Sequence, residues 1–163
     1  MTLKEALLQG QRLLEQAGVA EPRLTAEVLL AHATQHDRVW LVAHSNEELI
    51  ELWWIHYGRY LHQRIEGKPT QYITGHQEFY GRDFRVTPDV LIPRPETEHL
   101  VEAALKVNGR NILDVGTGSG CIAITLALET GARVTASDIS ATAVNIARQN
   151  ATELGAQVEF LIC

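Results

Sequence analysis

The 163-residue sequence has few cysteines, no long apolar run and no excess of basic residues. Two cysteines, Cys121 and Cys163, cannot build a disulfide framework, so we expect a protein of the reducing cytoplasm. No apolar run approaches the roughly 18 residues that span a bilayer, and the N-terminus lacks the basic and apolar regions of a secretory signal. A net charge of −6 provides no basic surface for broad nucleic-acid binding. We therefore expect a soluble globular protein of one ordinary or two small domains, with no membrane partner and no direct nucleic-acid partner.

A glycine-rich loop is the most informative feature of the sequence. Residues 111–120 read Asn-Ile-Leu-Asp-Val-Gly-Thr-Gly-Ser-Gly, and residues 121–128 continue as an apolar stretch that is compatible with a helix. This order of strand, loop and helix is typical of a ligand-binding turn, because glycines take positive φ and let a ligand approach the backbone. A second apolar run, Arg133–Ser137, ends in Asp138, about 20 residues after the loop, the separation at which an acid binds ribose hydroxyls.

The loop differs from the dinucleotide-binding pattern G-x-G-x-x-G/A, because Cys121 stands at the third glycine position. Asp114 would also repel a pyrophosphate, whereas its carboxylate suits an ammonium or sulfonium group. These points favour S-adenosylmethionine (AdoMet), with Asp138 on the ribose hydroxyls, the loop under the methionyl part and Asp114 near the ammonium group. The alternative is a glycine-rich turn that binds nothing. The predicted cofactor-binding residues are Asp114, Gly116, Thr117, Gly118, Ser119, Gly120 and Asp138.

Residues 2 to 67 have the pattern of a small helical bundle. Thr2 and Glu5 have capping-box spacing at the start of a leucine-rich first helix, which Gly18 ends. A second helix is predicted for Pro22–Ala33 and a short third one for Asp37–Ala43. The apolar face predicted for the second helix carries Leu24, Val28 and Ala31.

The last helix of the bundle is predicted to begin at a second capping box, formed by Ser45 and Glu48, and to end at Gly67. The three tryptophans of the sequence lie in the bundle, and two explanations stay open for them: packing inside the protein, or a surface for a partner protein. His32 and His36 have the i, i+4 spacing of a metal pair. No acidic or cysteine ligand is obviously placed to complete that site, so no metal is predicted.

Residues 71–86 change to an extended pattern, which predicts a β-hairpin. Residues 91–98 then read Leu-Ile-Pro-Arg-Pro-Glu-Thr-Glu, in which the prolines favour an extended approach and the acids open a helix to about Val107. A rigid linker that leads into a helix explains the two glutamates well and Arg94 poorly.

The C-terminal half alternates helix and strand from residue 96 onward. Its last helix is predicted over Ala141–Leu154, between a Ser140 cap and Gly155, and its last strand over Gln157–Ile162. Such alternation implies a parallel sheet whose ligand site lies at the carboxyl ends of the strands. The predicted fold class is α/β: a helical bundle (1–67), a β-hairpin linker (68–90) and the first half of a Rossmann-like sheet (91–163).

The order of bundle, hairpin, Leu91–Glu98 stretch and Asp114–Gly120 loop resembles the HemK/PrmC family, the peptide chain release factor glutamine N5-methyltransferases, over the whole chain. The resemblance implies AdoMet-dependent methylation of the glutamine in the Gly-Gly-Gln motif of release factors. The implied partner is therefore a release factor, recognised with help from the bundle and hairpin. The resemblance also implies that the glycine loop and Asp138 bind the cofactor.

One motif of that family, Asn-Pro-Pro-Tyr, is absent from the sequence. The family places this motif after the fourth strand of the sheet, and it holds the acceptor amide, whose delocalised lone pair makes the nitrogen a weak nucleophile. We therefore expect the N-terminal part of a longer enzyme, inactive alone, in which no catalytic residue can be assigned. The open edge and uncovered face of a half sheet further predict self-association.

Three alternative functions stay open. The first is a methyltransferase that acts on another protein glutamine, such as one in a ribosomal protein, because the cofactor loop does not select the acceptor. The second is a nucleotide-dependent oxidoreductase, which the glycine spacing and Asp114 disfavour. The third is a non-catalytic module that binds a release factor.

Overall fold

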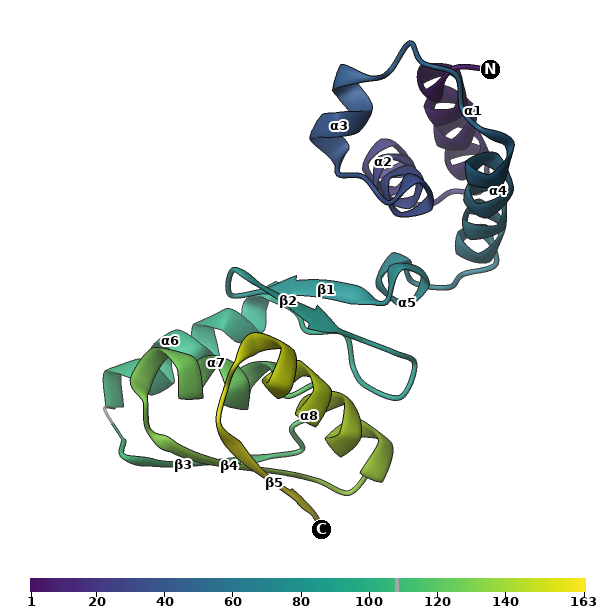
Figure 1. The fold of residues 1–163 in the computed structure, drawn as a ribbon. Helices are drawn as coiled ribbons and strands as arrows, with labels where there is room; N and C mark the ends of the chain where they lie inside the picture. Colours follow the sequence, from purple (N-terminus) through teal and green to yellow (C-terminus); the bar gives the residue numbers. More distant parts are fainter. Residues whose placement is uncertain (108) are drawn as a thin grey trace. The chain divides into compact units, whose positions relative to one another are not determined.

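The computed structural model describes residues 1–107 and 109–163, which form two compact units, residues 1–74 and residues 75–163 (Figure 1). Each unit has its own cluster of buried apolar side chains. The three predicted segments do not coincide with these units, because residues 68–90 are divided between the two. The hairpin belongs to the second unit because Phe79 and Phe84 pack in the same cluster as Val101 and Ile124.

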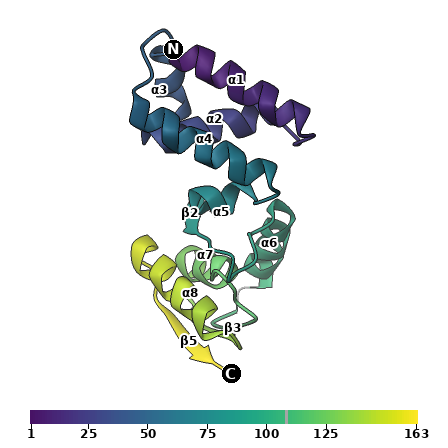
Figure 2. The ribbon, with the colours of Figure 1, turned by 90° about the vertical axis from the view of Figure 1, so that its right-hand side faces the viewer.

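The first unit is a bundle of helices, of which α1, α2 and α4 contact one another (Figure 2). Thr2 begins α1 as predicted: its hydroxyl accepts a hydrogen bond from the Glu5 amide at 3.2 Å, and the Glu5 carboxylate accepts one from the Thr2 amide at 2.8 Å. This reciprocal capping box is therefore confirmed. The helices of the unit are α1 (Leu3–Gln16), α2 (Pro22–Thr34), α3 (Arg38–Ala43), α4 (Glu51–Ile65) and α5 (Thr70–Thr74).

The second predicted capping box, at residues 45–48, is wrong, because α4 begins only after it. The backbone of this segment instead accepts hydrogen bonds from the first turn of α1. The Leu3 amide donates to the Glu47 carbonyl at 3.0 Å, and the Lys4 amide donates to the Ser45 carbonyl at 2.9 Å. The first amides of a helix have no partner inside the helix, so this segment satisfies α1 rather than starting α4.

The predicted apolar face of α2 is only partly correct: Leu24 is 39% exposed, whereas Ala31 packs against the buried cluster. The helix packs against both α1 and α4, so its buried stripe follows two neighbouring lines of side chains that are shifted from the predicted one. The buried residues of α2 are Thr25, Ala26, Leu29, Leu30, Ala33 and Thr34.

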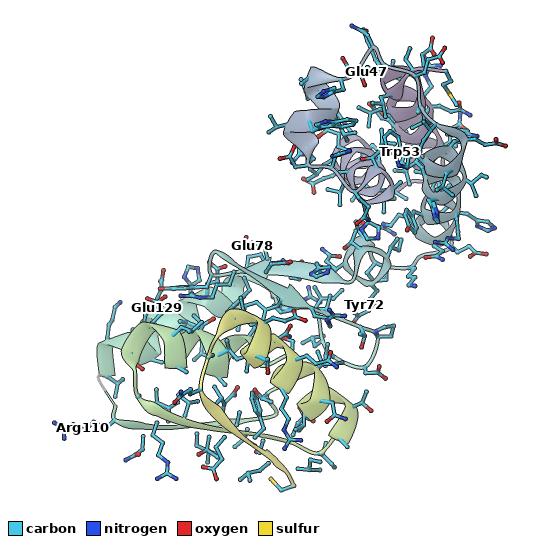
Figure 3. The ribbon with its side chains drawn as sticks, viewed as in Figure 1. Glu47, Trp53, Tyr72, Glu78, Arg110 and Glu129 are labelled. Carbon is cyan, nitrogen blue, oxygen red and sulfur yellow. The ribbon has the colours of Figure 1, made fainter. Side chains whose placement is uncertain are left out.

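The three tryptophans are half-buried and contact other rings of the bundle. Trp53, labelled in Figure 3, lies edge-on to Trp40, with ring centroids 6.1 Å apart. The His36 ring stacks on Trp40 at 3.8 Å, and the His32 ring lies 5.0 Å from Tyr60. The two histidines with metal-pair spacing therefore take part in ring contacts. In the described parts of the chain, no group of three His, Cys, Asp or Glu side chains is placed to hold a metal ion.

The second unit begins with an antiparallel hairpin of β1 (His76–Phe79) and β2 (Arg82–Arg85). Tyr80 and Gly81 join the strands with φ of 53° and 71°, the positive values that a tight two-residue hairpin turn requires. The hairpin is shorter than predicted, because residues 70–74 form α5. The Pro69 carbonyl accepts hydrogen bonds from the amides of residues 72 and 73, so a helical turn follows this proline instead of a strand.

The remaining elements form a parallel α/β layer, as predicted. The sheet has the order β3-β4-β5, and Figure 1 shows α6, α7 and α8 on one side of it. Ser140 caps α8 through the Ala143 amide, and Gly155 ends it at φ 72°, so both predicted boundaries are confirmed. The elements are the 3-10 turn η1 (Pro95–Thr97), α6 (Glu98–Val107), β3 (Asn111–Val115), α7 (Cys121–Thr130), β4 (Arg133–Asp138), α8 (Ala141–Leu154) and β5 (Val158–Ile162).

One face of this sheet is covered by helices, and apolar side chains on the other face are exposed. On the helical side, Val134 and Ala136 of β4 are buried against Ala123 of α7. On the opposite side, Leu113 is 66% exposed and Val115 is 74% exposed. The self-association expected from an open sheet stays a prediction. Along the described residues, no helix combines the length and apolarity needed to cross a membrane.

We predict opposite effects on stability for two helical Gly→Ala substitutions in the first unit. A Cβ on Gly10 of α1 would lie 1.9 Å from the Tyr57 hydroxyl oxygen and 2.7 Å from Cζ of the same ring. Gly10→Ala should therefore lower the free energy of unfolding by about 1–3 kcal/mol through overpacking.

The matched control is Gly58→Ala in α4, where a Cβ would meet no atom within 4 Å. This variant should gain about 0.5–1 kcal/mol from helix propensity alone. Urea unfolding followed by tryptophan fluorescence measures both changes, since the tryptophans lie in this unit. Equal effects of the two substitutions would contradict the close α1–α4 contact.

Candidate cofactor-binding site

The glycine loop, residues 116–120, lies at the carboxyl end of the parallel sheet. It joins β3 to α7, and the register pairs Val115 at the end of β3 with Ser137 near the end of β4. The Ser137 carbonyl accepts hydrogen bonds from two successive loop amides, those of Gly116 at 2.8 Å and Thr117 at 2.9 Å. The start of the loop is therefore fixed to the neighbouring strand, as the predicted location of the site requires.

The three loop glycines all take positive φ, but they serve two different purposes. A Cβ on Gly116 or Gly118 would meet no atom within 4 Å, so these residues leave open space beside the backbone. A Cβ on Gly120 would lie 2.9 Å from Cδ1 of Ile124 and 3.0 Å from Cβ of Ala147. Gly116 and Gly118 thus suit the close approach of a ligand, whereas Gly120 allows the loop to pack on α7 and α8.

Asp138 holds the middle of the loop with its carboxylate. Oδ2 accepts a hydrogen bond from the Gly118 amide at 2.9 Å, and Oδ1 accepts one from the Ser140 amide at 2.9 Å. Each carboxylate oxygen keeps a further lone pair, so the predicted bonds to ribose hydroxyls are compatible with these contacts. Half-buried Asp138 therefore lies directly at the loop, and its ligand contacts stay a prediction.

Asp114 lies near the end of β3 and contacts the glycine loop. Its Oδ2 accepts a hydrogen bond from the Thr117 hydroxyl at 2.7 Å. Burial raises the pKa of Asp114, the hydrogen bond from Thr117 and the Ala123 amide oppose that rise, and the negative charge of Asp138 adds to it.

The site therefore has two neighbouring carboxylates beside a glycine-rich backbone turn. The two negative charges favour a cationic ligand over a phosphate. Cys121, which follows the loop, is not suited to nucleophilic catalysis. Burial raises the pKa of its thiol to about 11, so the thiolate is scarce at neutral pH. The arrangement can bind and orient a ligand, and no catalytic residue is assigned to it.

One buried residue that contacts the loop was not predicted from the sequence. The Asn150 side chain of α8 donates to the Ser119 carbonyl at 2.8 Å and exchanges hydrogen bonds with the backbone of Arg85. Helix periodicity could have indicated its role, because Asn150 lies on the same face of α8 as Ile146 and Ala147. A polar side chain on that buried face needs a hydrogen-bond partner.

The Pro-Arg-Pro-Glu-Thr-Glu stretch also has a structural role that periodicity did not reveal. The Glu98 carboxylate accepts a hydrogen bond from the Tyr80 amide at 2.8 Å and so fastens the hairpin turn to the start of α6. Arg94 and Glu96 are exposed to solvent. The sequence analysis predicted acidic residues at the start of this helix, which accounts for the position of Glu98. It did not predict the hydrogen bond between Glu98 and the Tyr80 amide.

Comparison with known proteins agrees with this geometry. Residues 5–75 match the family of PrmC N-terminal domains, and residues 112–163 match a family of methyltransferase domains. The second unit therefore belongs to the class of methyltransferase domains. The order of a PrmC N-terminal domain and methyltransferase-domain sequence, with a relative that is 52% identical, confirms the predicted resemblance to the PrmC family.

Its relatives include proteins named release factor glutamine methyltransferase. The protein from Koribacter versatilis (strain Ellin345) is 52% identical over 167 residues, which cover 99% of this chain and 60% of the relative. Those from Neisseria gonorrhoeae (strain ATCC 700825 / FA 1090) and Moorella thermoacetica (strain ATCC 39073 / JCM 9320) are 50% and 47% identical, over 85% and 95% of this chain. The matched regions span 52% and 56% of those two relatives, so the chain corresponds to little more than half of each.

We predict that alanine at two loop glycines destabilises the second unit to different extents. Both substitutions force a residue with a Cβ into positive φ, at a cost of about 1–2 kcal/mol. Gly120→Ala adds overpacking against Ile124 and Ala147, for a further cost of about 1–3 kcal/mol. Gly116→Ala meets open space and pays only the backbone term. Hydrogen exchange of residues 111–130 during urea unfolding compares the variants, and a Gly116→Ala loss as large as that of Gly120→Ala would contradict the packing described.

Proposed function

We propose that the second unit binds AdoMet at the glycine loop and Asp138, as part of a protein-glutamine N-methyltransferase. The proposed substrate is the glutamine of the Gly-Gly-Gln motif in peptide chain release factors. The observation that carries this proposal is a glycine loop with open space at Gly116 and Gly118, flanked by Asp114 and Asp138, in a chain whose 52%-identical relative is named release factor glutamine methyltransferase.

The glycine loop and the two flanking aspartates each contact a different part of the proposed ligand. Asp138 accepts hydrogen bonds from the ribose hydroxyls, and ionised Asp114 attracts the ammonium group of the methionyl part. The backbone at Gly116 and Gly118 lies under the methionyl chain, where a Cβ would occupy the open space. AdoMet supplies an electrophilic methyl group on its sulfonium. The two carboxylates favour this cation and disfavour a pyrophosphate, which is why a nicotinamide dinucleotide is the weaker candidate.

The acceptor side of the reaction needs residues that have not been assigned in this sequence. An amide nitrogen is a weak nucleophile, so an enzyme must hold it in line with the methyl group and accept hydrogen bonds from its NH₂. The Asn-Pro-Pro-Tyr motif of the family does not occur in the 163 residues. We propose that the first unit contributes to recognition of the release factor in the cytoplasm. Methylation of another protein glutamine and non-catalytic binding of a release factor remain the alternatives.

A direct test of the cofactor is calorimetric titration of the 163-residue chain with AdoMet and with NAD. We expect AdoMet to bind at least about tenfold more tightly, because two carboxylates repel the pyrophosphate of NAD. Asp138→Ala should weaken AdoMet binding, since it removes the ribose contact and the Gly118 anchor. Asp89→Ala, which removes an exposed carboxylate from the 87–89 turn, is the control. Tighter binding of NAD than of AdoMet would overturn the proposed cofactor.

The affinity for AdoMet should fall as the pH is lowered. Burial raises the pKa of Asp114, only the ionised carboxylate attracts the ammonium group, and a bound cation favours that ionised form. Binding should therefore weaken as pH falls through the raised pKa, with proton release in the same range. Titrations from about pH 4 to about pH 7 in buffers of different ionisation enthalpy measure both effects. Asp114→Asn should weaken binding at neutral pH and flatten this part of the profile; an unchanged profile would exclude the role given to Asp114.

The acceptor is tested with a longer protein that contains these residues. Labelled methyl from AdoMet should appear in a release factor with Gly-Gly-Gln and not in a variant with Gly-Gly-Ala, because the side-chain amide is then missing. Ribosomal proteins serve as the competing acceptors. Labelling of a ribosomal protein instead of the release factor would select the other methyltransferase, and release-factor binding without labelling would select the binding module.

A further inference from the structure

The Asn150 side chain joins two parts of the second unit that are far apart in the sequence. It is 1% exposed and lies on α8, between strand β2 of the hairpin and the glycine loop. Oδ1 accepts a hydrogen bond from the Arg85 amide at 2.8 Å, and Nδ2 donates to the Arg85 carbonyl at 3.1 Å. The other Nδ2 hydrogen points to the Ser119 carbonyl at 2.8 Å. The amide thus uses both of its donors and one acceptor position on backbone groups.

The orientation of this amide follows from chemistry. The Arg85 amide can only donate, so it must face Oδ1, and the carbonyls of Arg85 and Ser119 can only accept, so they must face Nδ2. The Asn150 side chain therefore pairs with Arg85 much as a neighbouring strand would. A carboxylate of the same shape could not reproduce this arrangement, because it has no hydrogen to donate to either carbonyl.

The bond to Ser119 fixes the one loop residue between the two glycines that are already held. Gly118 is bound through its amide to Asp138, and the Gly120 amide donates to the Thr117 carbonyl at 2.8 Å. On the hairpin side, Phe84 next to Arg85 is fully buried in the cluster that contains Ile124. A movement of β2 therefore shifts Asn150 and alters its hydrogen bond to the loop. A movement of the loop likewise alters the hydrogen bonds between Asn150 and β2.

We propose that Asn150 is a positioning residue that couples the hairpin to the glycine loop. Ordering of the loop by a nucleoside ligand slows local opening of the hairpin, and by thermodynamic reciprocity a change at the hairpin alters the affinity for that ligand. The inference rests on the proposed function only in taking AdoMet as the ligand of the loop. It assigns the hairpin a second role beyond packing, as the element that reports cofactor occupancy on the protein surface.

Asn150→Asp is the test variant, because it keeps the shape of the side chain and removes both donated hydrogen bonds. Asn145→Asp is the matched control, since Asn145 is exposed on the same helix. Arg85→Ala is a second control: it removes the side-chain ion pair with Glu153 at 3.1 Å but leaves the backbone groups that Asn150 binds. Asn150→Ala serves if the charged variant does not fold.

The experiment combines calorimetry with hydrogen exchange, at a temperature at which circular dichroism shows every variant to be folded. In the unsubstituted chain, AdoMet should slow exchange in residues 76–86 as well as in residues 116–120. Asn150→Asp should weaken AdoMet binding at least about tenfold and abolish the slowing in residues 76–86 at saturating ligand, whereas both controls keep it. A merely structural role would lower stability without removing this response of the hairpin to the ligand.

Each result decides between the two proposals. If the unsubstituted chain binds AdoMet, and Asn150→Asp retains both the affinity and the hairpin response, the coupling is refuted while the proposed cofactor stands. If the unsubstituted chain binds no AdoMet, the proposed cofactor is refuted. Hydrogen exchange measured without ligand then tests whether Asn150 couples the hairpin to the glycine loop. Asn150→Asp must accelerate exchange in residues 76–86 and 116–120 together, and acceleration in only one of them overturns the inference.

Discussion

The attachment of the glycine loop to the end of β4 is the constraint on which the candidate site depends. The Ser137 carbonyl accepts hydrogen bonds from the amides of Gly116 and Thr117, and the Asp138 carboxylate accepts one from the next amide, that of Gly118. These bonds require β3 and β4 to be parallel and in register, so that both strands end at the same level. Because the backbone amides are held by the neighbouring strand, the loop can leave open space beside Gly116 and Gly118 without collapsing into it.

The loop is supported from the helical side by polar groups as well as by packing. Asp114 accepts a hydrogen bond from the Thr117 hydroxyl, and Asn150 donates one to the Ser119 carbonyl. Burying a carboxylate near a second one is unfavourable, as the raised pKa of Asp114 reflects. The site therefore combines an ordered backbone with negative charge that is incompletely compensated within the protein, which is the environment that a cationic nucleoside would stabilise.

The hairpin belongs to the methyltransferase-domain unit for similar reasons. Phe79 and Phe84 bury their rings with side chains of α6 and α7, while Glu98 and Asn150 satisfy backbone groups of the turn and of β2. Apolar burial supplies non-directional stabilisation, and the buried hydrogen bonds select one arrangement of the hairpin. The Pro-Arg-Pro-Glu-Thr-Glu stretch that ends in Glu98 thus acts partly through the hairpin turn rather than only as the start of a helix.

Local features of the chain could be predicted from the sequence, because they depend on contacts between residues close together along it. The capping box at Thr2, the boundaries of α8, and the strand, loop and helix around residues 111–130 are of this kind. Tertiary structure alone decided which segment satisfies the first turn of α1, which face of α2 is buried, and which residue holds Ser119. Each of these outcomes depends on a backbone group or helix brought near by folding. Helix periodicity can place Asn150 on a buried face, but it cannot identify the distant backbone group that Asn150 binds.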